Sequence, residues 1–220
     1  MIYRQNIGLQ TYHFADLKDV LAKASPARSG DYLAGIAAQT YAERMAARMC
    51  LAAVPLSTFL EDLIIPYETD EVTRLIVDTH CCSAFAEISH LTVGDFRDWL
   101  LSDLADTATL KRVANGITPE MAAAVSKIMR NQDLILVAKK CQVSTSFRNT
   151  IGLANQLSVR LQPNHPTDDM RGIAASMLDG LLYGAGDAVI GINPATDSLS
   201  ALMDLYCMVD DVINQYEIPT

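Results

Sequence analysis

The chain has 220 residues, which is enough for one large domain or two small ones. Apolar residues make up 50% and charged residues 20%, a globular composition that excludes a disordered, collagenous or coiled-coil chain. The formal net charge of -9 argues against nucleic acid as a partner, because phosphate binding needs a basic surface. No apolar run reaches the ~18 residues of a membrane span, and the first residues lack the apolar core of a signal peptide.

Five cysteines are scattered along the chain, at positions 50, 81, 82, 141 and 207. None forms a Cys-x-x-Cys pair and no histidine lies beside them at metal-ligand spacing, so no metal site is predicted. An odd, scattered set is typical of reduced, buried thiols in the cytosol. The adjacent Cys81 and Cys82 leave a redox site open, although a buried helical pair is the favoured interpretation.

The first part of the chain, residues 1–150, is predicted to be mainly helical. A short extended segment with a hairpin around Gly8 is expected before the first helix. A long alanine-rich helix is expected over residues 31–54, ending at Pro55. Three further helix starts are marked by a threonine cap: Thr58 with Glu61, Thr92 with Asp95, and Thr118 followed by Pro119.

From residue 151 the pattern becomes strand, helix, strand, helix, which predicts a parallel βαβα unit. Residues 156–162 and 187–192 are the two strands, and Thr167 is a candidate cap for the helix between them, with Asp168 and Asp169 in its first turn. The predicted apolar stripes are Met170, Ile173, Ala174, Met177 and Leu181 in the first helix, ended by Gly184, and Leu199, Leu202, Met203, Tyr206, Val209, Ile213 and Tyr216 in a second helix over 197–216.

One face of the first strand is polar, and it carries Arg160 and Gln162. A strand covered on both sides is apolar on both, so this face must line a polar space. Gly191 and Asn193 point to the same side of the second strand. Arg160, Gln162 and Asn193 are therefore expected to converge at the C-terminal ends of adjacent parallel strands, where α/β barrels carry their active sites. The opposite face, expected to pack on helices, is Leu157, Val159, Leu161, Ala188, Ile190 and Ile192.

Arg160 is conspicuous because residues 151–220 carry nine acids and only two bases. An internal ion pair, for instance with Asp187, is the structural alternative to a site, and both interpretations stay open at this point. His165 is expected to be a solvated loop histidine rather than a catalytic one. No histidine pair suggests a metal.

The sequences RLQPN at 160–164 and DAVIGINP at 187–194 resemble the large (heavy) subunit of ethanolamine ammonia-lyase, and the resemblance continues upstream. The upstream segments are Arg28-Ser29-Gly30-Asp31, Val72-Thr73-Arg74-Leu75-Ile76, Leu101-Ser102-Asp103 and Ala138-Lys139-Lys140. The resemblance implies an α/β fold: a mainly helical region over 1–150, then the first two βα units of a (β/α)8 TIM barrel over 151–220. That barrel would be incomplete in this chain.

The resemblance also implies an activity, the adenosylcobalamin-dependent conversion of ethanolamine to acetaldehyde and ammonia by radical amino migration. Arg160, Gln162 and Asn193 would be substrate ligands, and the backbone at Pro194 would lie against the cobalamin. The implied partners are the small (light) subunit and other heavy chains. The implied location is the cytoplasm, inside a bacterial microcompartment.

Family members continue for roughly as long again, with further strands and two carboxylates for the substrate ammonium. We therefore expect a truncated heavy chain that is inactive by itself. The alternative is a non-catalytic fragment or paralogue that serves as an assembly or interaction module.

Overall fold

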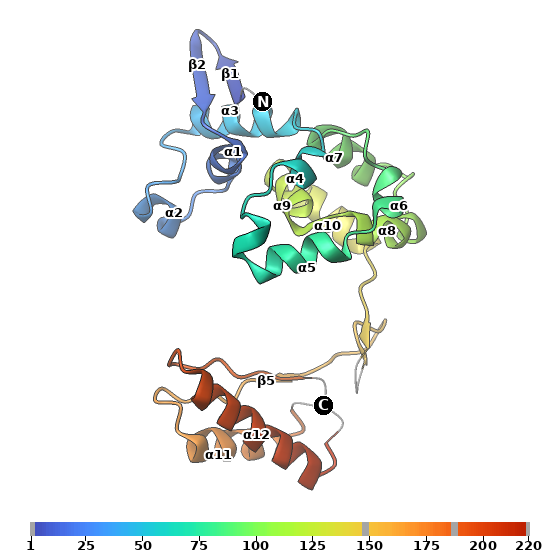
Figure 1. Cartoon of the computed structure of the whole chain (residues 1–220). Helices are drawn as coiled ribbons and strands as arrows, with labels where there is room; N and C mark the ends of the chain where they lie inside the picture. Colours follow the sequence, from blue (N-terminus) through green and yellow to red (C-terminus); the bar gives the residue numbers. More distant parts are fainter. Residues whose placement is uncertain (1–2, 147–149, 186–188, 219–220) are drawn as a thin grey trace. The chain divides into compact units, whose positions relative to one another are not determined.

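The computed structural model describes residues 3–146, 150–185 and 189–218 (Figure 1). These residues are mostly helical with a few short strands, and they form no barrel. No helix within them is long and apolar enough to cross a membrane. The chain divides into two compact units, Met1–Gln142 and Val143–Thr220.

The elements of the first unit are β1 (Tyr3–Ile7), β2 (Gln10–Phe14), α1 (Leu17–Ala24), α2 (Ser29–Leu33), α3 (Tyr41–Ala52), α4 (Thr58–Glu61), η1 (Tyr67–Thr69), α5 (Glu71–Thr79), α6 (Cys82–Ala86), α7 (Val93–Leu101), α8 (Thr107–Val113), η2 (Ala114–Gly116), α9 (Pro119–Lys127) and α10 (Asn131–Lys140). Those of the second unit are β3 (Thr145–Ser146), β4 (Thr150–Ile151), β5 (Arg160–Leu161), α11 (Met170–Leu182), β6 (Val189–Ile190) and α12 (Leu199–Gln215).

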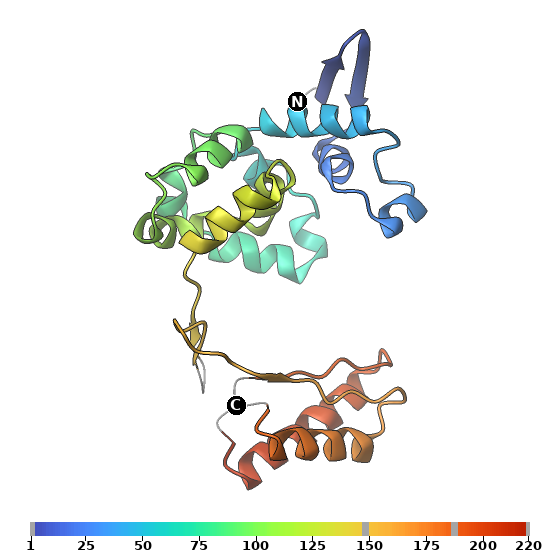
Figure 2. The ribbon, with the colours of Figure 1, turned by 180° about the vertical axis from the view of Figure 1, so that it is seen from behind.

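The hairpin expected around Gly8 is confirmed. Strands β1 and β2 pair antiparallel, with Tyr3 opposite Phe14, and Gly8 has a φ of 62° in the turn between them. Glycine adopts this left-handed conformation without a steric penalty. Helix α3 contacts both the hairpin and α1 (Figures 1 and 2). Tyr3 and Phe14 are buried in the core that these elements share.

The long helix expected over residues 31–54 is wrong, because two helices, α2 and α3, occupy this stretch. Gly35 follows α2 with a φ of 71°, which no α-helix continues through. The Thr40 hydroxyl then accepts a hydrogen bond from the Glu43 N–H at 3.0 Å and starts α3 anew. The alanine run favours helix by propensity, but a left-handed residue and a new cap divide it.

Two of the three expected threonine caps are confirmed. Thr92 and Asp95 form a reciprocal capping box on α7, and Thr118 caps α9. The box at Thr58 is wrong, since Thr58 is already inside α4 and the cap residue is Ser57, whose side chain makes no capping bond. Ser57 has helical backbone angles, so the chain turns before Thr58 can act as a cap.

The second unit contains the parallel strand pair that the alternation predicted, although it is much shorter. Arg160 pairs with Val189 and Leu161 with Ile190, and α11 connects the two strands. Helix α12 packs against α11 (Figure 2). The strand was expected from residue 156, but the pairing among the described residues begins at Arg160 and ends at Leu161.

The strand face that was expected to pack on helices is also smaller than predicted. Leu157 is 97% exposed and Val159 is 42% exposed, whereas Leu161 is half-buried and lies against Gly180 of α11. Residues 187 and 188 of the second predicted strand lie outside the described residues.

The expected cap at Thr167 is wrong, because Asp169 caps α11 by accepting the Gly172 N–H at 2.7 Å. Ile173 and Met177 of the predicted α11 stripe are buried, and Gly184 has the expected left-handed φ of 76°. The α12 stripe is wrong for most of its length: the residues buried in α12 are Leu205 and Val209, while the exposed ones include Leu199, Met203, Tyr206 and Tyr216. The predicted stripe is wider than the face of α12 that α11 covers.

The expectation of buried cysteines holds only for Cys50. Cys81 is half-buried, and Cys82, Cys141 and Cys207 are exposed. Cys82 lies in the first turn of the short helix α6, whose buried residues are Ala84 and Phe85.

Candidate functional site

The side chain of Arg160 lies against Gly191, on the face of the strand pair that is turned away from α11. A Cβ atom on Gly191 would meet Nη2 at 2.6 Å, Nε at 2.8 Å and Cζ at 3.0 Å of Arg160. Leu161 points the other way, onto Gly180 of α11. Neighbouring strand residues therefore face opposite sides, as the alternation predicts.

Gln162 and Asn193 follow β5 and β6, respectively, at the same end of the strand pair because the strands are parallel. Both residues are exposed, as is Pro194. Among the described residues no hydrogen bond joins the side chains of Arg160, Gln162 and Asn193 to one another. The structure thus brings Arg160 onto Gly191 and places Gln162 and Asn193 after the ends of the two strands.

The alternative partner of Arg160, Asp187, lies outside the described residues. None of the ion pairs among the described residues involves Arg160.

Two residues of the loop after β5 hold the loop after β6. The Asn164 Oδ1 atom accepts the Asn193 N–H at 2.9 Å. The Asp168 carboxylate accepts the N–H of Ala195 at 2.7 Å and both the N–H (2.8 Å) and the hydroxyl (2.6 Å) of Thr196. These donors lower the pKa of Asp168, with the largest contribution from the Ala195 N–H, and keep the carboxylate ionised at neutral pH.

Sequence interpretation missed this role, because Asp168 was taken as part of the helix start. The available signal was the pair of adjacent acids before one helix. A helix has one N-cap residue, and since Asp169 caps α11, Asp168 is left to bind elsewhere. Asp168 has a φ of 52°, a left-handed conformation that aspartate tolerates better than most residues, and its side chain serves the other loop.

His165 lies in a loop, as expected, but it is half-buried rather than solvated. Its ring lies against Gly172 in the first turn of α11, where a Cβ atom would come within 2.6 Å of Cδ2. Its Nδ1 atom lies 3.1 Å from the Thr167 hydroxyl. These contacts give the ring a structural role in the loop.

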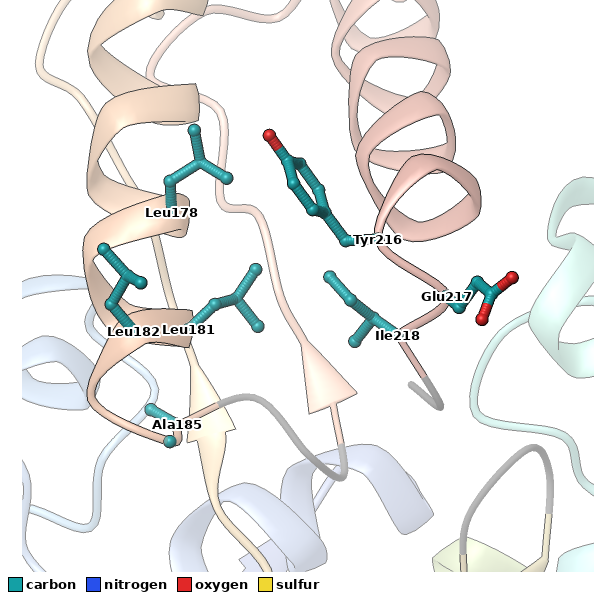
Figure 3. A pocket seen from close by; sticks show the side chains of 8 residues that line it. Leu178, Leu181, Leu182, Ala185, Tyr216, Glu217 and Ile218 are labelled. Carbon is teal, nitrogen blue, oxygen red and sulfur yellow. The ribbon is translucent and has the colours of Figure 1, made fainter.

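Two hollows among the described residues of the second unit concern the candidate site. An apolar groove of about 530 Å³ is formed by the C-terminal ends of α11 and α12, where Leu178 and Leu181 face Tyr216 and Ile218 (Figure 3). A second hollow, of about 430 Å³, begins at Pro194 and extends over the first turn of α12. Only the second adjoins the carboxyl ends of the strands, which is where ligands bind in α/β folds.

The described residues of the second unit thus contain a short parallel strand pair joined by a helix, with polar residues where both strands end. The sequence is more specific: residues 12–220 match the family described as ethanolamine ammonia lyase large subunit (EutB). The chain belongs to this family.

Two relatives illustrate the match. The chain is 42% identical over 209 residues to the ethanolamine ammonia-lyase large subunit of Escherichia coli K12, covering 95% of this chain and 46% of the relative. It is 43% identical to that of Salmonella typhimurium, with the same coverage. The chain therefore spans about half the length of the curated relatives that it matches.

Proposed function

We propose that this chain contributes the first part of the active site of an adenosylcobalamin-dependent ethanolamine ammonia-lyase, which converts ethanolamine to acetaldehyde and ammonia by radical amino migration. Residues 1–150 would be its N-terminal helical region, and residues 151–220 the first two βα units of its TIM-barrel catalytic domain. The observation that carries the proposal is the Arg160 side chain, which lies over Gly191 on the face turned away from α11.

Three side chains would bind the substrate. Ethanolamine offers a hydroxyl group and an ammonium group. The Arg160 guanidinium donates a charge-assisted hydrogen bond to the hydroxyl oxygen, where electron density shifts during amino migration. The amide carbonyls of Gln162 and Asn193 accept from the ammonium, and their NH₂ groups donate to the hydroxyl.

Pro194 would lie against the cofactor. Its surface is exposed and borders the open hollow over α12, so a large planar ligand can reach its backbone. This part of the chain would contact the organic body of the cofactor. Bound adenosylcobalamin would supply the radical chemistry, and these residues would orient the substrate and exclude water.

The proposal includes partners and a location. The matched relatives are named as large subunits, which supports a small subunit as the partner. We further propose an oligomer of heavy chains and a cytoplasmic location in a bacterial microcompartment.

The test is a chimaera in which this chain replaces the matching part of the Escherichia coli large subunit. The chimaera is assembled with the small subunit and given adenosylcobalamin and ethanolamine. We expect acetaldehyde production and a substrate-dependent change in cobalamin absorbance. An assembled chimaera that binds the small subunit but produces no acetaldehyde would overturn the proposal and favour a role as an assembly module.

A further inference from the structure

The loops after β5 and β6 are joined by four hydrogen bonds, and every acceptor belongs to the first loop. Asn164 accepts the Asn193 N–H at 2.9 Å. Asp168 accepts the Ala195 N–H at 2.7 Å, the Thr196 N–H at 2.8 Å and the Thr196 hydroxyl at 2.6 Å. Because the donors are 27 to 29 residues away from the acceptors, the bonds are tertiary contacts and not local turns.

These bonds leave the backbone of residues 193–196 little freedom. The N–H groups of Asn193, Ala195 and Thr196 are all engaged, and Pro194 has no N–H and a fixed φ. An ionised carboxylate that accepts three donors forms stronger bonds than neutral groups would. The two residues proposed to face substrate and cofactor, Asn193 and Pro194, thus lie in a segment that another loop holds.

We propose that Asp168, aided by Asn164, is a positioning residue that fixes the backbone of residues 193–196 and thereby directs the Asn193 side chain and Pro194 toward the site. The inference rests on the proposed function for what Asn193 and Pro194 do there. The restraint on the backbone of residues 193–196 rests only on the hydrogen bonds and not on the proposed function.

The variants separate this role from helix capping and from general stability. Asp168→Ala removes the acceptor of three bonds, and Thr196→Val removes only the hydroxyl donor, which Thr196→Ser keeps. Asp169→Asn is the matched control, because it changes the neighbouring carboxylate and keeps a good helix cap. Ile173→Val weakens the core of the same unit and removes none of the four hydrogen bonds between the loops.

The first measurement is amide hydrogen exchange of the full chain, resolved by residue. In Asp168→Ala we expect the Ala195 and Thr196 amides to exchange at least about ten-fold faster, since their acceptor is gone. In Asp169→Asn they should exchange as in the wild type. Unchanged exchange at both amides in Asp168→Ala would overturn the inference. If Asp168→Ala does not fold, Thr196→Val must show faster exchange at Thr196 and Thr196→Ser must not.

The second measurement is turnover in the chimaera. Misplacing a ligand by about 1 Å can cost ~100-fold in rate, so we expect Asp168→Ala to raise the KM for ethanolamine about ten-fold or more. Thr196→Ser should retain the wild-type KM and Ile173→Val should leave it unchanged. An equal rise of KM in Ile173→Val would overturn the positioning role. A chimaera without turnover would refute the proposed function, whereas the exchange result would still decide the restraint.

Discussion

At the scale of single residues, Gly191 and Arg160 depend on each other. The exposed guanidinium lies where the Cβ atom of any other residue at position 191 would be, at 2.6 to 3.0 Å. A flexible, exposed side chain can move aside, so the conflict costs little stability. The conflict would instead change the direction in which the Arg160 side chain points.

We therefore predict that Gly191→Ala displaces the guanidinium and raises the KM for ethanolamine in the chimaera about ten-fold, with the melting temperature nearly unchanged. Gly30→Ala is the matched control, because no atom beyond its chain neighbours and its own helix backbone lies within 4 Å of a Cβ built there. Steady-state kinetics and thermal unfolding measure both effects. Wild-type KM in Gly191→Ala would show that the position of Arg160 over Gly191 has no part in substrate binding.

At the scale of elements, Thr92 and Thr58 have similar sequence surroundings and different structural roles. Thr92 and Asp95 exchange hydrogen bonds at the start of α7, at 3.1 Å in each direction between side chain and backbone. Thr58 caps nothing. We predict that Thr92→Ala lowers the free energy of unfolding by about 1 kcal/mol, because it removes the side-chain acceptor of the Asp95 N–H at the helix start. Thr58→Ala should stay within about 0.5 kcal/mol of the wild type. Urea unfolding measures both, and equal losses would contradict the assignment of the caps.

A second element-scale feature joins α1 to α3. Lys23 Nζ lies 2.8 Å from Glu43 Oε1, with the two side chains 23% and 15% exposed. Burial alone would raise the pKa of Glu43, but the hydrogen bonds from Lys23 and from the Gln39 N–H hold that pKa below its ordinary value. The hydrogen bond to Glu43 raises the pKa of Lys23.

The signs of these shifts predict a pH dependence. Because the pKa of Glu43 is lower in the folded protein, its carboxylate stabilises the fold at pH values above the unfolded pKa of about 4.3. This stabilisation is lost as the pH falls through the pKa of the folded protein. The raised pKa of Lys23 also stabilises the fold. This contribution is complete at pH values below the pKa of Lys23 in the unfolded chain, and it is lost only in strong base. We expect wild type to exceed Glu43→Gln in stability by about 1 kcal/mol at pH 7, with the difference shrinking as acid protonates Glu43. Glu71→Gln, which changes an ion pair whose carboxylate side chain is 84% exposed, is the control. A difference that persists in acid would contradict the account.

Elements with strong local signals could be predicted from sequence, and those that depend on tertiary neighbours could not. The hairpin at Gly8 and the Thr92 and Thr118 caps are local and were predicted. The break at Gly35 was missed because alanine propensity outweighed one glycine. The α12 stripe failed because burial depends on which neighbour covers the helix.

The candidate site divides in the same way. Strand alternation predicts which side Arg160 faces, because period two is local. The bonds of Asp168 to Ala195 and Thr196 join loops 27 and 28 residues apart, so no short-range pattern predicts them. A pair of adjacent acids before one helix was the only sign that one of them has another partner.

At the scale of the whole molecule, apolar surface lies open in the second unit. The residues that line the groove of Figure 3 include three leucines, Tyr216 and Ile218, and one of these leucines, Leu182, is 86% exposed. Open apolar patches of this kind promote association. We predict that the isolated chain self-associates with rising concentration and that Leu182→Glu weakens the association. Leu104→Glu, at a leucine 75% exposed in the first unit, should not. Sedimentation velocity over a concentration series measures this, and a monomer throughout would refute the prediction.

We also predict that the isolated chain, mixed with the small subunit, adenosylcobalamin and ethanolamine, produces no acetaldehyde. Arg160, Gln162 and Asn193 are all exposed, and a radical reaction requires a site closed to water. Sustained acetaldehyde production by these 220 residues without the remainder of a large subunit would contradict this prediction.

The most direct test of the central claim is ethanolamine turnover by the chimaera with Arg160 changed. Arg160→Lys keeps the charge but loses the planar fork, so it should be impaired yet active. Arg160→Ala should lose at least about 100-fold in kcat/KM, in line with the loss of a single oxyanion-stabilising donor, and added guanidinium should restore part of it. Turnover in Arg160→Ala equal to that of the unsubstituted chimaera would contradict the account.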